Sequence, residues 1–276
     1  MDMKFLYKLL DVKSELYDIL TSTTVEVNDG MKAYPQYILD IDGQYVGGYF
    51  CYGWSDFETL PDVDGYRSYM FYNCKNLKYL PDRINANGLI CTFSGCDSLE
   101  DISNVEFVGC YDFSSTFEDC INLKFLPHIV LSLEPYYERF SLSWMFRGCT
   151  SLVEAPTFTI PTYSYYKTEA STTYGMFEGC INLESVPEYD MWTVTGATDM
   201  FKGCGSLKHL GGFPNLRVDL SLEDSPLLTY ESLMNVINGL SKGFDSTLKL
   251  NAESVSKLTP EDIAIATDKR WTIAVK

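Results

Sequence analysis

Hydrophobic residues recur through the middle of the chain in one fixed order: Phe, two variable residues, Cys, two variable residues, Leu. This order occurs six times, with the cysteines at positions 74, 96, 120, 149, 180 and 204. Successive cysteines lie 22 to 31 residues apart, and the two longest spacings surround position 149. Such self-similarity predicts a solenoid, because a single unit cannot bury its own apolar face and must stack on its neighbours.

The repeated side chains are expected to form internal columns. Phe and Leu are six residues apart with Cys at the third position, a rhythm that suits one turn of helix or 3₁₀ helix. Endings such as Leu126-Pro127 predict a short extended segment closed by proline. The predicted core consists of Phe71, Cys74, Leu77, Phe93, Cys96, Leu99, Phe117, Cys120, Leu123, Phe146, Cys149, Leu152, Phe177, Cys180, Leu183, Phe201, Cys204 and Leu207.

The full motif resembles a known family. It is [Met/Ala]-Phe-x-Gly-Cys-x-[Ser/Asn]-Leu-x-x-[Leu/Ile]-Pro, and Met176 to Pro187 is a close example. This pattern is similar to the BspA-type leucine-rich repeat of bacterial surface adhesins and gut Bacteroidales bacteriophage proteins. The resemblance implies an α/β repeat solenoid with short strands. The asparagine ladder of ordinary leucine-rich repeats is missing, so their uniform parallel sheet is not carried over.

Three segments are expected: an N-terminal part at 1–50, the repeats at 51–215 and a C-terminal part at 216–276. Apolar residues at helical spacing predict an amphipathic helix over 3–20, and a turn at Asp42-Gly43 predicts a β-hairpin. The N-terminal part either caps the first repeat or docks to a larger assembly, and both possibilities stay open.

The C-terminal part loses the cysteine motif and becomes regular α/β. Thr229 is a helix N-cap, and Thr259-Pro260 begins a second helix with proline at its first position. We expect this part to form a leucine-rich-repeat-like cap. The predicted elements are strands at 217–222, 247–250 and 271–275 and helices at 230–240, ending at Gly243, and at 260–269.

The two longest repeats contain insertions at 129–143 and 157–174. Extra length in a repeat emerges on one face, and that face is often the binding face. The insertions are rich in tyrosine, which provides rigid amphipathic contact area. The alternative is an extra hairpin whose tyrosines pack locally across strands. The candidate binding residues are Tyr136, Tyr137, Tyr163, Tyr165 and Tyr166.

Composition narrows the range of partners. The formal net charge is −17, so nucleic acid and anionic membrane surfaces would be repelled. The simplest role of the surface acidity is solubility. A cationic partner or bound Ca²⁺ is the alternative explanation. No apolar run is long enough to span a bilayer, and the first residues show no readable signal peptide.

The inventory of reactive groups predicts no catalysis. Six of the nine cysteines occupy one repeat position, and stacked equivalents would have poor disulfide geometry, so we expect buried free thiols. The histidines, His128 and His209, stand at variable positions. Known catalytic motifs and zinc-like spacings are absent from the sequence. We therefore expect no enzyme activity, no cofactor and no metal site.

These features predict a non-catalytic structural or adhesive protein that presents a surface to a protein or glycan. Together with the resemblance, the lack of a recognisable signal peptide favours a bacteriophage virion component (fibre, tail or capsid-associated). Such a component could assemble through the N-terminal helix. One alternative is an intracellular or surface-associated bacterial scaffold or adhesin. Another is a glycan-processing enzyme, which would need a pair of facing acids.

Overall fold

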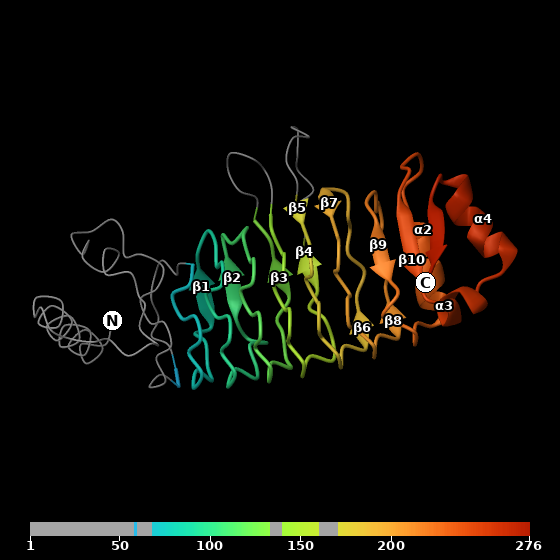
Figure 1. The fold of residues 1–276 in the computed structure, drawn as a ribbon. Helices are drawn as coiled ribbons and strands as arrows, with labels where there is room; N and C mark the ends of the chain where they lie inside the picture. The colour runs from blue at the N-terminus through green and yellow to red at the C-terminus, as the bar shows by residue number, and fades with distance from the viewer. Residues whose placement is uncertain (1–57, 60–67, 133–139, 160–170) are drawn as a thin grey trace, which may run out of the picture.

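The computed structural model describes residues 58–59, 68–132, 140–159 and 171–276. Within them, repeat units follow one another along a single direction in sequence order, and three helices stand at the C-terminal end (Figure 1). We call each unit a rung. The six rungs with the cysteine motif are centred on Phe71, Phe93, Phe117, Phe146, Phe177 and Phe201.

Short parallel strands join each rung to the next. Strand β1 (Arg83–Asn85) pairs in parallel with β2 (Glu106–Val108), so that Ile84 lies opposite Phe107. Parallel bridges also connect Asp112 to Ser141 and Ser141 to Thr172. The other parallel pairs are β3 (Ile129–Val130) with β4 (Phe158–Thr159), β5 (Ser171–Thr172) with β7 (Val194–Gly196), and β6 (Ser185–Val186) with β8 (His209–Leu210).

The backbone around each motif phenylalanine is bonded to the next rung. In the rung of Phe146, the N–H groups of Trp144, Phe146 and Gly148 donate to Tyr174, Met176 and Glu178, at 2.7, 3.0 and 2.8 Å. The same three positions donate in the same way in the rungs of Phe71, Phe93, Phe117 and Phe177. The donors therefore point sideways along the stack, and each rung is held in register by the next one.

The motif segments are hydrogen-bonded turns rather than the helical or 3₁₀ turns expected from their spacing. Bonds between residues three apart are present, as in Cys149 N–H to Phe146 O at 3.1 Å. However, the residue before each motif cysteine has positive φ, which interrupts a right-handed helix after a single turn. These residues are Asn73, Gly95, Asp119, Gly148, Gly179 and Gly203. Gly, Asn and Asp are the residue types that adopt this conformation most readily.

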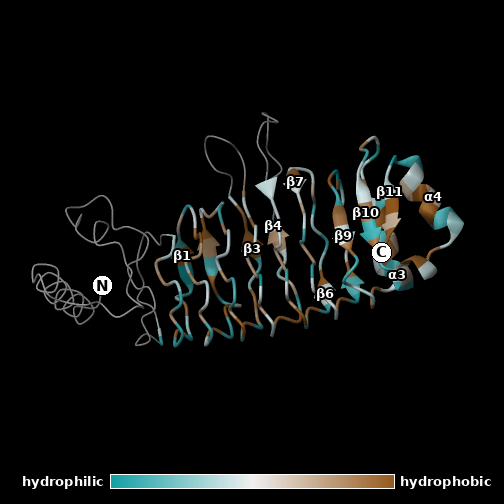
Figure 2. Cartoon of the chain, viewed as in Figure 1, coloured by the Kyte–Doolittle hydropathy of each residue, from teal (hydrophilic) through white to brown (hydrophobic). Residues whose placement is uncertain are grey.

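The interior is a set of continuous columns. All eighteen residues of the predicted core are at most 3% exposed. From Phe71 to Phe201, successive motif phenylalanine rings are stacked with centroids 5.7 to 5.8 Å apart and planes within 14°. This lies in the range preferred by aromatic pairs. Apolar residues recur in every rung rather than gathering at one end (Figure 2).

The motif cysteines add a hydrogen bond to their packing. The thiol of Cys149 donates to the carbonyl oxygen of Phe117 at 3.1 Å, and that of Cys180 donates to Phe146 at 3.0 Å. Burial raises the pKa of the Cys120 thiol to about 12, so it remains a protonated donor at neutral pH. The eight cysteines of the described residues form no disulfide with one another. Cysteine therefore acts here as a small apolar residue that also donates to the preceding rung.

The C-terminal part ends the stack with a three-stranded parallel sheet. Its order is β11 (Thr272–Val275), β10 (Thr247–Leu250) and β9 (Leu220–Leu222). All three strands fall within the predicted segments. The indole of Trp271, just before β11, is buried and donates to the carbonyl oxygen of Ser241 at 2.9 Å, which anchors this last strand.

Helices α2 (Tyr230–Gly239) and α4 (Pro260–Asp268) begin at their predicted caps. The Thr259 hydroxyl accepts from Asp262 N–H and the Asp262 carboxylate accepts in return, which forms a capping box. Helix α2 ends before Gly243, because the chain turns to extended geometry at Leu240. A short helix, α3 (Ala252–Ser256), was not predicted.

The tail also closes the hydrogen-bond ladder of the last motif rung. The N–H of Gly203, whose counterparts donate to a neighbouring rung, donates instead to the carboxylate of Asp224 at 2.9 Å. The Ser225 hydroxyl donates to the Cys204 carbonyl oxygen at 3.2 Å. Side chains thus satisfy groups that would otherwise be left open. The expected N-terminal helix at 3–20 and the hairpin lie outside the described residues.

We expect Phe146→Ala and Leu152→Ala each to lower the free energy of unfolding by about 2–5 kcal/mol, because each leaves a cavity in a packed column. Phe125→Ala is the matched control, since Phe125 is 55% exposed. Chemical denaturation of the variants measures the differences. Equal stability of Phe146→Ala and the unmodified chain would contradict the core assignment.

Gly179→Ala tests the conformational requirement of the motif turn. Gly179 has a φ of 76°, and an added Cβ would meet only ordinary contacts at 3.7 Å, so the cost is backbone strain of roughly 1–2 kcal/mol. Gly205→Ala is the control, because a Cβ there meets nothing within 4 Å. Thermal melts should separate the two variants, and a Gly179→Ala protein as stable as Gly205→Ala would refute the argument.

Stability should fall as pH rises above about 9, because the buried thiols resist ionisation. The pKa of Cys120 rises from 9.0 to about 12 on folding, so above pH 9 the unfolded chain loses a proton that the folded chain keeps. Cys120→Ser should reduce the loss of stability between pH 8 and pH 10.5, whereas Ser206→Ala should leave it unchanged. Denaturation curves across this range provide the measurement, and equal losses in both variants would exclude the linkage.

Candidate binding surfaces

The tyrosines predicted to form a binding surface are Tyr136, Tyr137, Tyr163, Tyr165 and Tyr166. All five lie in segments 133–139 and 160–170, outside the described residues, as does the alternative of an extra hairpin. The chain re-enters the described part at Phe140 and at Ser171. The residues that follow these two points therefore form the described base of both insertions.

Two exposed aromatic residues stand at this base. Trp144 is 41% exposed and Tyr174 is 37% exposed. They belong to consecutive rungs, and the Trp144 N–H donates to the Tyr174 carbonyl oxygen at 2.7 Å. Their backbones are thus fixed side by side.

Glycines of the following rungs make room for both rings. A Cβ at Gly175 would lie 2.7 Å from Cδ1 and 2.8 Å from Nε1 of Trp144. A Cβ at Gly196 would lie 2.2 to 2.4 Å from atoms of the Tyr174 ring. Each ring therefore rests against bare backbone, and any larger residue at these glycines would displace it. We call Trp144 and Tyr174 the aromatic pair.

A chain of hydrogen-bonded hydroxyl groups runs through the two rungs of the aromatic pair and the rung before them. The Ser114 hydroxyl donates to the Asp112 carboxylate at 2.6 Å and is 2.8 Å from the Ser141 hydroxyl. The Thr172 hydroxyl is 3.2 Å from that of Ser141 and 2.8 Å from that of Ser143. Ser143 directly precedes Trp144, and Thr172 precedes Tyr174 by two positions. We call these five residues the hydroxyl row; it crosses three rungs.

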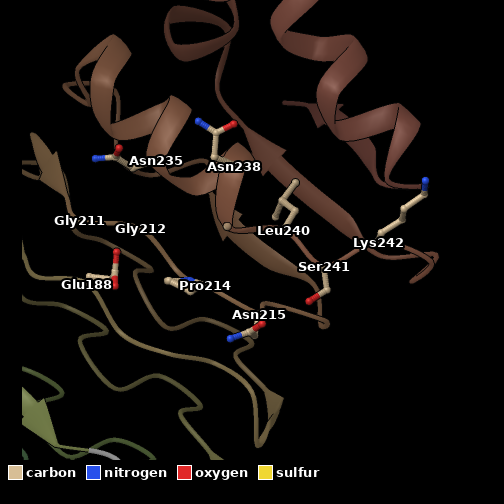
Figure 3. A pocket seen from close by; sticks show the side chains of 11 residues that line it. Glu188, Gly211, Gly212, Pro214, Asn215, Asn235, Asn238, Leu240, Ser241 and Lys242 are labelled. Atoms are coloured by element: carbon tan, nitrogen blue, oxygen red, sulfur yellow. The ribbon is translucent and has the colours of Figure 1, made fainter.

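A second candidate is an open groove of about 580 Å³ between the last motif rung and helix α2. Figure 3 shows Asn235 and Asn238 projecting from the helix side, with Glu188 and Asn215 on the other side. The lining is mainly polar, whereas small-molecule pockets are mostly apolar. The lining residues are Glu188, Gly211, Gly212, Pro214, Asn215, Asn235, Asn238, Gly239, Leu240, Ser241 and Lys242.

On a third surface, two exposed aromatic rings are already in contact with a side chain of the same chain. The guanidinium carbon of Arg217 lies 3.7 Å from the ring centroid of Trp192 and 5.3 Å from that of Phe244. This cation–π arrangement stabilises the surface locally. The indole of Trp192 therefore already has a partner within the chain, in contrast to Trp144, which rests on a glycine.

Charged side chains alternate in sign along two columns. In the first, Arg147 pairs with Glu118 at 3.0 Å and with Glu178 at 3.4 Å, and Lys202 pairs with Glu178 at 3.0 Å. The second contains the pairs Lys78–Glu58, Lys124–Glu100 and Lys208–Glu184. Exposed pairs each stabilise by only about 0.2–1 kcal/mol. Their alternation favours the correct register, because slippage by one rung would bring like charges together.

His128 forms contacts between rungs, and the described residues offer no metal site. The ring nitrogens of His128 lie 2.7 and 2.8 Å from the hydroxyls of Thr157 and Thr159 in the next rung. In the part of the chain that the structure describes, no cluster of three His, Cys, Asp or Glu side chains is placed to bind a metal. Nor does this part contain a helix with the length and apolar character needed to cross a membrane.

In comparisons with known proteins, no family model, curated protein or solved structure matches this chain. The likeness to BspA-type repeats therefore rests on the sequence motif.

Sequence reasoning placed the binding surface in the insertions and missed Trp144, the hydroxyl row and the groove. One signal was available for Trp144. It occupies the position two residues before the motif phenylalanine, where the next rung has Gly175. A large aromatic followed by glycine at the equivalent position of the next repeat indicates a ring lying across the rung boundary.

Proposed function

We propose that the chain is a non-catalytic, BspA-type repeat solenoid that presents a binding surface to a protein or glycan. Its proposed place is a bacteriophage virion, as a fibre, tail or capsid-associated component. In this proposal, the repeats supply a stiff support and the outward residues at the base of the insertions supply the contacts.

The observation that carries the proposal is the contrast between inward and outward positions. The inward Phe, Cys and Leu are the same in all six motif rungs and are buried. The position directly after the phenylalanine varies: Tyr72, Glu118, Arg147, Glu178 and Lys202 are at least partly exposed there, whereas Ser94 is buried. A scaffold with a constant core and variable exterior is the arrangement that repeat proteins use for recognition.

The chemistry of the base of the insertions supports binding rather than catalysis. Its hydroxyl groups and aromatic rings provide hydrogen bonds and contact area. The hydroxyl row contains one carboxylate, that of Asp112, and the nearby Glu178 carboxylate is held by Arg147 and Lys202. General acid–base catalysis of glycoside cleavage uses two carboxyl groups. The glycan-processing alternative therefore receives no support from this surface.

The free thiols bear on where the protein folds. The cysteines of the described residues form no disulfide with one another, which is usual for proteins that mature in a reducing compartment. This favours a protein folded inside a cell, and it supports both a virion component and an intracellular bacterial scaffold over an exported adhesin.

Fractionation of the producing culture tests the proposed location. We expect the chain to co-purify with phage particles through a density gradient, at a constant ratio to the major capsid protein. Immunogold labelling of those particles should place it on the capsid, tail or fibre. Recovery only in the soluble cell fraction would instead support the bacterial scaffold, and recovery on washed cells the adhesin.

A further inference from the structure

We propose that the aromatic pair and the hydroxyl row form a binding site for a neutral oligosaccharide. Pyranose rings would stack on Trp144 and Tyr174 while their hydroxyl groups bond to Asp112, Ser114, Ser141 and Thr172. This inference names a ligand class for the binding surface and therefore rests on the proposed function.

The site combines the two kinds of surface that a sugar has. A pyranose has an apolar C–H face and a rim of hydroxyl groups. Trp144 and Tyr174 offer flat apolar rings with a polar tip, exposed by 41% and 37%. In the same two rungs and the preceding one, each hydroxyl of the row can both donate and accept, which matches the hydroxyls of a sugar. The Asp112 carboxylate adds a strong, charge-assisted acceptor.

The site is also held in place before any ligand arrives. The 2.7 Å backbone bond fixes Trp144 beside Tyr174, and both rings rest on glycines. Hydrogen bonds of 2.6 to 3.2 Å orient the hydroxyls. Since little side-chain freedom is lost on binding, even a small contact area gives measurable affinity.

The charge of the surroundings selects a neutral ligand. The chain has a formal net charge of −17, and Asp112 lies within the row itself. The nearby Glu178 carboxylate is paired with Arg147 and Lys202, so the local negative charge comes from Asp112. Uronic acids, sialic acids and sulfated sugars would be repelled by this field.

A protein partner fits this site less well. Stable protein interfaces bury about 800 Å² on each partner around a largely apolar centre. The described surface instead has two separate aromatic residues bordered by a carboxylate and hydroxyls. Of the other candidates, Trp192 is already covered by Arg217, and nothing in the structure indicates what would fill the groove beside helix α2.

Titration of the full chain with neutral hexasaccharides tests the inference. The probes are cello-, manno-, chito- and galactohexaose. Their binding is measured by calorimetry and by tryptophan fluorescence. We expect saturable binding of at least one of them, with a Kd on the order of 1 mM or lower. Trp144→Ala and Tyr174→Ala should each weaken that binding at least tenfold, a loss of about 1.4 kcal/mol.

Three further variants separate the site from general effects on folding. Gly196→Ala keeps both aromatic residues but displaces the Tyr174 ring, so it should also weaken binding. Tyr79→Ala and Phe125→Ala remove aromatics that are 60% and 55% exposed elsewhere, so they should bind as the unmodified chain does. Thermal midpoints of all variants confirm that the folded state is being compared.

The outcomes are separable. Absence of binding by all four sugars, or equal binding by Trp144→Ala and the unmodified chain, overturns the sugar site. If the chain is nevertheless found in particles, the proposed function stands without it. Sugar binding by a chain found only in cells would retain the site and remove the virion location.

Discussion

The hydrogen bonds between rungs are the interaction on which the rest of the structure depends. At each motif turn, alternate N–H groups donate to the following rung, as in Phe146 to Met176 and Gly148 to Glu178. In this geometry, the residue before each motif cysteine has a positive φ, in the left-handed region. Because the backbone fixes the register, the phenylalanine rings can stack at a constant spacing and the thiols can reach the carbonyl oxygens of the preceding rung. For the same reason, exposed residues at equivalent positions of consecutive rungs lie side by side in rows.

The sequence was most informative where identical residues repeat. The Phe, Cys and Leu positions were assigned to the interior from spacing alone, and the caps at Thr229 and Thr259 marked both longer helices. The turn conformation was missed, because spacing of three fits both a 3₁₀ helix and an isolated turn. Glycine before cysteine was the clue to positive φ. The contact of Trp144 with Gly175 joins residues 31 positions apart, so it can be read only by comparing equivalent positions of consecutive repeats and not from the pattern within one repeat.

The candidate site shows how a regular scaffold produces an irregular surface. The outward position that carries Trp144 in one rung carries Gly175 in the next, and the ring lies across the boundary. Substitutions at outward positions leave the columns untouched, so the surface can change without reorganising the core. The alternating charges act in the opposite sense: they limit which residues can be neighbours, as Arg147 between Glu118 and Glu178 illustrates.

The contact between Asp224 and Gly203 has a consequence for self-association. A parallel stack leaves a row of open amides at its final rung, and such a row is a template for pairing with another molecule. Here the Asp224 carboxylate accepts one of those amide hydrogens within the chain, so the last motif rung is covered by the C-terminal part. On this side the outer strand of the described sheet is β11, so a second molecule that paired with the backbone there would meet β11 and not a motif rung.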